Sequence, residues 1–297
     1  MSDLIKKYRN HIHVLNSNVI LNIGPMRLRI IARKDGKPLT RAAIDGAKLA
    51  IKLLDEVSRY RNALKHSASD IGNYSIFPEV VQRMISACLI TKDRDLTPMS
   101  AVAGAISDMV AENIEKKGST KVIVENGGDI AIKLHNDEMG KIGIVPRVGE
   151  TEYAHVINVN AESKIGGIAT SGFGGLGFTK GAASAAVALS PNGALADACG
   201  TILGNSTIVE SAKVIYRFAE ELDPNTDIKG QKVTFAVDRL THKEISICIQ
   251  NGLKKAEELM KMGVVICAVI FVQGKVGMTP KNIATPVGLN TINKITL

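Results

Sequence analysis

Alternation between apolar and polar residues marks three short segments near the start of the chain. They read HIHVLN (residues 11–16), VILNIG (19–24) and MRLRIIARK (26–34), and Asn or Gly-Pro stands at their boundaries. A period of two residues is typical of strands that bury one face. We therefore expect three consecutive strands at the beginning of the fold.

The next three segments carry apolar residues at helical spacing instead. Residues 40–64 have one apolar face, formed by Ile44, Ala47, Ile51, Leu54 and Val57. Residues 77–90 form a second predicted helix, with Pro78 suited to its first turn. The third and clearest covers residues 96–118, where Thr97 can cap, Pro98 fits the first position and Gly118 suits the C-terminal end.

Strand patterns return after residue 118 and then alternate with helical ones. We expect antiparallel strands at residues 121–126, 129–135, 141–147 and 152–160, and a buried strand at 182–190 that leads into a helix over 192–203. A helix from Ser206 or Thr207 to residue 222, strands at 232–238 and 244–249, a helix at 251–263 and a strand at 264–274 complete the prediction. The segment after Lys275 has no strong pattern.

Residues 166–181 differ from the rest because seven of these sixteen positions are glycine. Such a stretch exposes too much backbone for a core element, so we predict a long loop. Long loops in compact domains are usually functional or mobile.

The predicted order of elements indicates an α+β fold with antiparallel sheets and helices packed on one face. TPMSAVAGAISD and SPNGALADACGT resemble each other, since each places Ala three and five residues after a helix-opening Pro and carries an Asp. This internal echo suggests duplication. We expect a single domain over residues 1–297, made of two related halves (about 1–150 and 151–275) and a tail (276–297).

Composition describes an ordinary globular chain, with 45% hydrophobic and 22% charged residues among 297. The formal net charge is +8, but Lys and Arg are spread out and no aromatic-rich motif for stacking bases accompanies them. We therefore expect no nucleic-acid partner. An anionic small molecule is compatible with the same charge.

The four cysteines are far apart in sequence and stand in apolar surroundings, which favours buried free thiols in a reducing compartment. The N-terminus has no apolar leader segment, and no apolar run reaches membrane-spanning length. We expect a cytoplasmic protein without membrane contact.

One carboxylate stands among small and apolar residues in LSPNGALADACGTIL. Asp197 and Thr201 are four residues apart, so a helix places their side chains on one face. A carboxylate and a hydroxyl are half of a site for Mg²⁺, which prefers oxygen ligands and completes its shell with water and phosphate. The alternative is structural: Asp197 bonds backbone amides and Thr201 bonds a helix carbonyl.

Two further segments are candidates for ligand contacts. In ENGGDIAI, Asn126, Gly127, Gly128 and Asp129 either form a plain hairpin turn or let a ligand approach the backbone, with the two polar side chains in contact. In GGIATSGFGG, the unhindered amides around Thr170, Ser171 and Gly172 are a plausible phosphate cradle. No Walker loop and no serine nucleophile elbow are present in the sequence.

Taken together and in this order, SDMVAENIEKKG…VIVENGGDI, GGIATSG and ADACGTIL resemble the ApbE superfamily, whose typical members transfer FMN from FAD to Ser or Thr of target proteins. The resemblance extends from about Thr97 to Leu203. Residues 227–263 are more similar to a small, poorly characterised ApbE-related branch. A T-fold-like α+β architecture with internal duplication is what this resemblance implies.

The resemblance also implies roles for individual residues. Asp197 and Thr201 fall on the Mg²⁺ ligands, and the main-chain carbonyl of Ile106 would complete the protein's share, because AGAISD aligns with the family's KGYAxD motif. Asn126 falls on an Asn before paired glycines that contacts flavin in the family, and the TSG turn falls on residues 170–172. Asp108 is a candidate general base in the same segment, with helix capping or a salt bridge as the alternative role.

The chain departs from the family pattern at several positions that grip the substrate. Ala103 and Ala105 stand where the motif has Lys and Tyr, which removes a charge and a stacking ring. TSGDYER becomes TSGFGGLG, and the His-x-x-Asp-Pro stretch has no counterpart. The positions that would bind Mg²⁺ through oxygen are therefore retained, while several positions that contact the substrate in the family are lost.

Two functional hypotheses follow. The first is an ApbE-like protein that binds Mg²⁺ and a phosphorylated flavin- or nucleotide-like ligand, with FAD as one candidate, and acts as a transferase at a pyrophosphate. The second is a non-catalytic flavin- or nucleotide-binding or assembly protein that has lost FMN transfer. A homodimer is an expectation from the resemblance alone.

Overall fold

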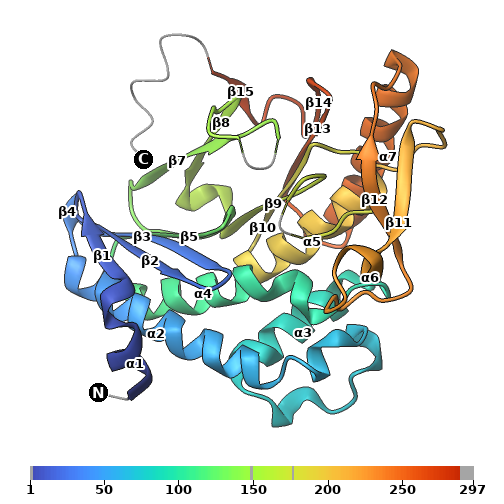
Figure 1. The fold of residues 1–297 in the computed structure, drawn as a ribbon. Helices are drawn as coiled ribbons and strands as arrows, with labels where there is room; N and C mark the ends of the chain where they lie inside the picture. The colour runs from blue at the N-terminus through green and yellow to red at the C-terminus, as the bar shows by residue number, and fades with distance from the viewer. Residues whose placement is uncertain (1–2, 148–149, 176, 288–297) are drawn as a thin grey trace. The chain divides into compact units, whose positions relative to one another are not determined.

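The computed structural model describes residues 3–147, 150–175 and 177–287 (Figure 1). Its contacts divide the chain into two compact units. The first comprises Met1–Met139, Asn160–Ala169 and Ser190–Ala198, and the second comprises Gly140–Val159, Thr170–Leu189 and Cys199–Leu297. Each unit is described by itself below.

The first unit contains an antiparallel sheet in the order β1-β2-β3-β5-β6-β9. Its strands are β1 (Ile12–Leu15), β2 (Asn18–Ile23), β3 (Met26–Lys34), β5 (Lys121–Asn126), β6 (Asp129–Leu134) and β9 (Gly167–Ser171), and the short β4 (Lys37–Pro38) pairs with β3. Strand β3 alternates strictly, with Met26, Leu28 and Ile30 buried between more accessible arginines. The predicted strands at the start of the chain are therefore confirmed.

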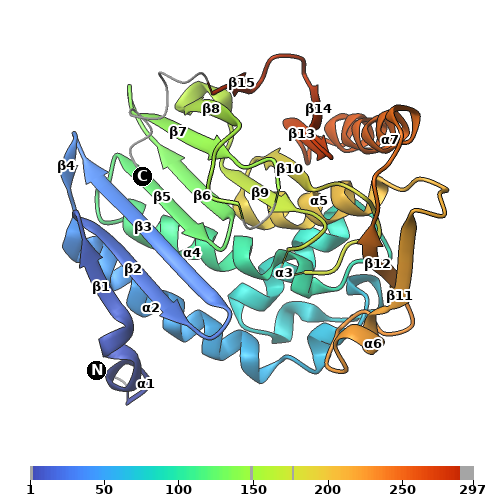
Figure 2. The same cartoon turned by 45° about the horizontal axis from the view of Figure 1, so that its top comes forward.

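Helices α2 (Thr40–Arg59) and α4 (Val102–Glu115) pack against one face of this sheet, as Figure 2 shows. Helix α3 (Glu79–Thr91) packs on both of them, and α1 (Asp3–Tyr8) contacts α2. The short 3₁₀ turns are η1 (Arg9–His11), η2 (Ala63–Lys65), η3 (Ala68–Asp70), η4 (Tyr74–Ile76) and η5 (Pro98–Ala101). The predicted arrangement of helices on one face of an antiparallel sheet holds for this unit.

The second unit contains three small antiparallel arrangements. Strands β10 (Ala185–Ser190), β13 (Cys267–Val272) and β14 (Lys275–Thr279) pair in that order, and α7 (His242–Lys261) packs on the last two. Strands β7 (Met139–Ile144), β8 (His155–Asn160) and β15 (Thr285–Pro286) form a sheet in the order β15-β8-β7, and η6 (Ala161–Ser163), which follows β8 in sequence, belongs to the first unit. Strand β11 (Val214–Phe218) pairs with β12 (Lys232–Val237) and is followed by α6 (Ala219–Leu222).

Helix α5 (Gly193–Ser206) follows β10 directly, as predicted, and the division between the units falls within it, after Ala198. The four cysteines are buried and form no disulfide, as predicted.

Some sequence predictions were wrong. The predicted helix from residue 206 to 222 is instead strand β11 with the single turn α6, because Ile215 and Phe218 belong to a two-stranded ribbon. The predicted strand at 244–249 lies inside α7, whose first turn is stabilised by a capping box between Thr241 and Glu244. The short alternating run EISICI therefore also fits helical spacing.

Other boundaries also moved. The helix predicted from residue 40 ends at Arg59, and the one predicted from residue 96 opens as η5 before α4 begins at Val102. Thr97 makes no side-chain cap, although Pro98 does occupy the first position of η5. Residues after Lys275 include β14 and β15, while residues 288–297 of the predicted tail lie outside the described part.

The glycine-rich stretch is not a loop throughout, since β9 occupies its beginning. A Cβ on Gly166 would lie 2.1 Å from the Pro191 carbonyl oxygen, and one on Gly167 would lie 2.2 Å from the Asn192 carbonyl oxygen. These glycines allow a strand to lie against the backbone that precedes α5. The high glycine content reflects close packing here rather than an open loop.

Candidate functional site

Helices α4 and α5 approach each other at two glycines in their first turns. A Cβ built on Gly104 would lie 2.1 Å from the carbonyl oxygen of Gly193, and one built on Gly193 would lie 2.9 Å from the carbonyl oxygen of Gly104. Only residues without a side chain permit backbones to come this close. The N-terminal ends of the two helices are therefore in direct contact within the first unit.

Each helix provides a carboxylate that caps the other. Asp108 of α4 accepts hydrogen bonds from the amides of Gly193 (2.7 Å) and Ala194 (2.9 Å). Asp197 of α5 accepts one from the amide of Gly104 at 3.0 Å. In both helices the aspartate follows its contact glycine by four residues, in GAISD and GALAD. The amides in a first helical turn have no intrahelical partner, so both carboxylates satisfy otherwise unpaired donors.

Burial affects both carboxyl groups strongly. It raises the pKa of Asp108 to about 6, and the amides of Ala194 and Gly193 act in the opposite direction. The pKa of Asp197 is raised well above its ordinary value, first by burial and then by the negative charge of Asp129, against the effect of the Gly104 and Ala103 amides. A positive charge placed beside Asp197 would stabilise its ionised form and relieve this penalty.

Asn126 and the residues after it form the tight hairpin between β5 and β6. Asn126 pairs with Asp129 across the turn, and Gly127 and Gly128 have φ angles of 66° and 113°. The hairpin that the NG dipeptide favours is therefore present. Nothing lies within 4 Å of a Cβ built on either glycine, so the turn leaves open space above its backbone.

The buried Asn126 side chain connects this hairpin to the start of α4. Its amide nitrogen donates to the carbonyl oxygen of Ala103 (3.5 Å), and its oxygen accepts from the amide of Arg27 (3.3 Å). Ala103 is also one of the residues whose amides face Asp197. The structure thus brings Asn126, Asp129 and Asp197 together around the first turn of α4.

The remaining predicted metal ligands are placed as follows. Thr201 lies one turn after Asp197 on α5 and is partly accessible. Ile106 lies inside α4, where helix geometry engages its carbonyl oxygen with an amide four residues later, leaving its second lone pair for any other contact. Among the described residues, no group of three or more His, Cys, Asp or Glu side chains could hold a metal ion.

The predicted TSG turn belongs to the second unit. Thr170 and Ser171 end β9, and a Cβ on Gly172 would lie 2.8 Å from the carbonyl oxygen of Ser184. Close packing explains this glycine. Whether these residues contact phosphate stays a prediction.

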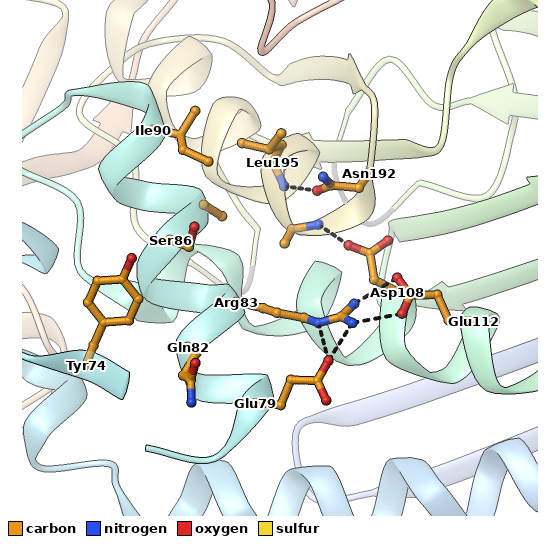
Figure 3. A pocket seen from close by; sticks show the side chains of 12 residues that line it. Tyr74, Glu79, Gln82, Arg83, Ser86, Ile90, Asp108, Glu112, Asn192 and Leu195 are labelled. Atoms are coloured by element: carbon orange, nitrogen blue, oxygen red, sulfur yellow. Dashed lines mark hydrogen bonds and ion pairs between the residues drawn. The ribbon is translucent and has the colours of Figure 1, made fainter. Parts of the chain in front are cut away.

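A pocket of about 540 Å³ opens in the first unit beside Asp108 (Figure 3). Its walls come from η4, one side of α3, one side of α4 and the start of α5. The lining residues are Tyr74, Glu79, Gln82, Arg83, Ser86, Ala87, Ile90, Asp108, Glu112, Asn192, Ala194 and Leu195.

A charged network lies at the base of this pocket. The Arg83 guanidinium donates to both carboxylate oxygens of Glu112 at 2.8 Å and to Glu79 at 2.6 and 3.0 Å. Sequence reasoning missed this pocket. The i, i+4 spacing of Glu79 and Arg83 was a visible signal, but Glu112 is 29 residues from Arg83 and joins it only through tertiary packing.

Comparisons with known proteins agree with this fold. The family model described as AbpE bacteria matches residues 10–278. The chain is 35% identical to a UPF0280 protein of Methanosarcina acetivorans over 158 residues, which are 52% of this chain and 59% of that protein. It is 25% identical to a UPF0280 protein of Methanococcus vannielii over 236 residues, covering 77% of this chain and 87% of the relative.

Among solved structures, the chain is similar to the ApbE protein of Thermotoga maritima, with a TM-score of 0.54 and 11% identity over 88% of this chain and 96% of that one. At this identity the likeness shows the fold alone. It confirms an ApbE-like mixture of helices and antiparallel sheet. The chain spans about three fifths of the length of the first methanogen relative.

Proposed function

This chain belongs to the AbpE bacteria family, and we propose that it binds Mg²⁺ together with a phosphorylated flavin- or nucleotide-like ligand and acts as a transferase at a pyrophosphate. The observation that carries the proposal is the cluster around the first turn of α4. There the carboxylate of Asp197 lies near the open turn of Gly127 and Gly128 and the buried side-chain amide of Asn126.

Asp197 and Thr201 supply oxygen donors of the kind that a hard cation prefers. Asp197 has two oxygens, of which Oδ2 accepts from Gly104, and the hydroxyl of Thr201 follows one helical turn later. Burial and then the charges of Asp129 and Asp108 raise the pKa of Asp197, so a cation beside it would be stabilised. Asp197 and Thr201 would hold Mg²⁺ with the carbonyl of Ile106, and the bound ion would neutralise charge on a pyrophosphate.

The hairpin supports ligand binding in a different way. The open space above Gly127 and Gly128 lets a ligand approach backbone amides, which suits contacts to phosphate or to the edge of a ring. Two backbone groups position the Asn126 side chain: the amide of Arg27 and the carbonyl oxygen of Ala103. Thr170, Ser171 and Gly172 stay proposed phosphate contacts.

A second candidate function is non-catalytic binding of the same ligand class. The observation that favours it concerns Asp108, whose two oxygens are both occupied by the amides of Gly193 and Ala194. A carboxylate used as a helix cap is poorly placed to accept a substrate proton. Ala103 and Ala105 also leave the motif without its charge and its ring.

Titration with FAD, FMN and ATP, with and without Mg²⁺, tests these functions. Conversion of FAD and water to FMN and AMP, detected by mass spectrometry, would support the transferase site, with water as the acceptor. Tight binding without turnover would support the non-catalytic function. Absence of binding by all three ligands would contradict both.

The metal assignment has its own test. Asp197→Asn keeps an oxygen that can accept from Gly104 but removes the charge. We expect Mg²⁺ to raise the unfolding temperature of the natural protein and not that of the variant. Equal Mg²⁺ stabilisation of both would show that Asp197 is not a ligand, and Asp137→Asn, an exposed site, serves as the matched control.

Several broader expectations belong to the same proposal. The reciprocal capping of α4 and α5 through GAISD and GALAD supports internal duplication and a T-fold-like plan of two related halves. A cytoplasmic location and a homodimer remain proposals. Within the described residues, no helix is both long and apolar enough to cross a bilayer.

A further inference from the structure

The pocket beside α3 has the size and the mixed lining of a small-molecule site. Its volume of about 540 Å³ lies within the usual range for ligand pockets, which is roughly 300–1,000 Å³. Apolar groups from Ile90, Leu195 and the ring of Tyr74 form part of the wall, and polar groups converge from three helices (Figure 3).

The charge of this pocket is opposite to that of the whole chain. Its lining contains three carboxyl groups, Glu79, Asp108 and Glu112, and one guanidinium, Arg83, whereas the chain carries a formal charge of +8. Arg83 donates four hydrogen bonds to Glu79 and Glu112. Its positive charge is therefore already paired within the lining.

The lining offers several hydrogen-bond acceptors. Gln82 uses its amide nitrogen on the carbonyl oxygens of Ser75 and Phe77, which leaves its own oxygen as an acceptor. Among the residues that the structure describes, no hydrogen bond engages the hydroxyl groups of Tyr74 and Ser86. Their oxygens, and the second oxygen of Glu79, can all accept.

From this lining we propose that the pocket binds a small organic cation, a primary or secondary amine with an apolar body. An ammonium group has up to three donors and no acceptor, so it matches a pocket lined by three carboxyl groups and one guanidinium, with several further acceptors. The apolar body packs against Ile90, Leu195 and Tyr74. This inference goes beyond the proposed function, whose ligand is anionic, and does not depend on it.

Three ligands of the same shape test the proposal. We would titrate ¹⁵N-labelled protein with cyclohexylamine, cyclohexanol and cyclohexanecarboxylate in Mg²⁺-free, nucleotide-free buffer and follow amide chemical shifts. We expect saturable binding of the amine and no binding of the carboxylate. The alcohol should bind at least about tenfold more weakly than the amine, because a charge-assisted hydrogen bond is roughly twice as strong as a neutral one. Equal affinity for all three, or no binding of the amine, would overturn the proposal.

Substitutions locate the site. Ile90 lines the pocket and is 48% exposed, so Ile90→Lys introduces a competing ammonium without emptying the core, and we expect loss of amine binding. Ile208 is similarly exposed at 44% but belongs to the second unit, so Ile208→Lys should bind as the natural protein does. Unchanged amine affinity in Ile90→Lys would refute the site.

A milder variant keeps the test independent of folding. Glu79→Gln preserves shape and removes one negative charge at a side chain that is 62% exposed. We expect amine affinity to fall by about threefold to tenfold with an unchanged unfolding temperature, because exposed ion pairs contribute little to stability. An affinity equal to that of the natural protein would contradict the charge argument.

Discussion

The contact between α4 and α5 makes Gly104 the most sensitive small residue of the candidate site. In Gly104→Ala, the new Cβ would lie 2.1 Å from the carbonyl oxygen of Gly193, 2.4 Å from its carbonyl carbon and 2.8 Å from the amide nitrogen of Ala194. All three are backbone atoms. No side-chain rotation can relieve the overlap, so the two helices must separate.

The expected cost follows from opposing effects. Replacing Gly by Ala inside an unobstructed helix stabilises it by up to about 1 kcal/mol. Overpacking against fixed neighbours costs about 1–3 kcal/mol, and separation also weakens the caps formed by Asp108 and Asp197, each of which contributes about 1 kcal/mol. We therefore expect a net loss of roughly 3 kcal/mol.

Urea denaturation followed by circular dichroism measures this loss directly. Gly193→Ala should cost less, since its nearest contact would be 2.9 Å, and Gly72→Ala, which meets nothing within 4 Å, should change stability little. The order of stability is therefore Gly72→Ala, then Gly193→Ala, then Gly104→Ala. A Gly104→Ala protein as stable as Gly72→Ala would refute the close approach of the two helices.

Three further predictions concern caps and charge. Asp108→Asn retains an acceptor for one of the two α5 amides but not both, so we expect a loss of about 1–3 kcal/mol in urea denaturation, with no loss in the exposed control Asp137→Asn. Thr241→Ala removes the side-chain half of the α7 capping box and should cost about 1 kcal/mol by the same assay; a cost near zero would mean that the box does not form in solution. Hydrogen bonds from Ser211 and Thr241 lower the pKa of Glu244 to about 2 from its ordinary 4.5, so its contribution is present above pH 4.5 and is lost as the pH falls toward 2. Stability of the natural protein should therefore decline more steeply over that interval than stability of Glu244→Gln, and parallel acid profiles would contradict the assignment.

Much of the local structure was predictable because its causes are local. The alternation in MRLRIIARK, the spacing in residues 40–59 and the NG dipeptide at Asn126 each depend on residues within a few positions of one another. Local patterns gave a wrong prediction where a segment fits both the strand period and the helix period. EISICI alternates like a strand, yet the capping box at Thr241 and the longer apolar spacing to Leu259 make it helical.

The candidate site shows the same division. Sequence spacing alone indicated that Asp197 and Thr201 share a helix face, and the structure agrees. The sequence left open whether Asp197 bonds backbone amides. The structure shows that Asp197 accepts a hydrogen bond from the amide of Gly104, 93 residues away. Asp108, considered for proton transfer from its motif, has both oxygens engaged in a cap.

Local patterns in the sequence were enough to predict most of the strands, the long helices and the tight turn at Asn126, although not β11 or the start of α7, because backbone preference and apolar periodicity act over a few residues. Tertiary packing brings the first turns of α4 and α5 together, lets each supply the other's cap, and joins Glu112 to Arg83 in the lining of a pocket. Those contacts require a close approach of backbones that Gly104 and Gly193 permit. No local sequence pattern indicates which distant amide will donate to a given carboxylate.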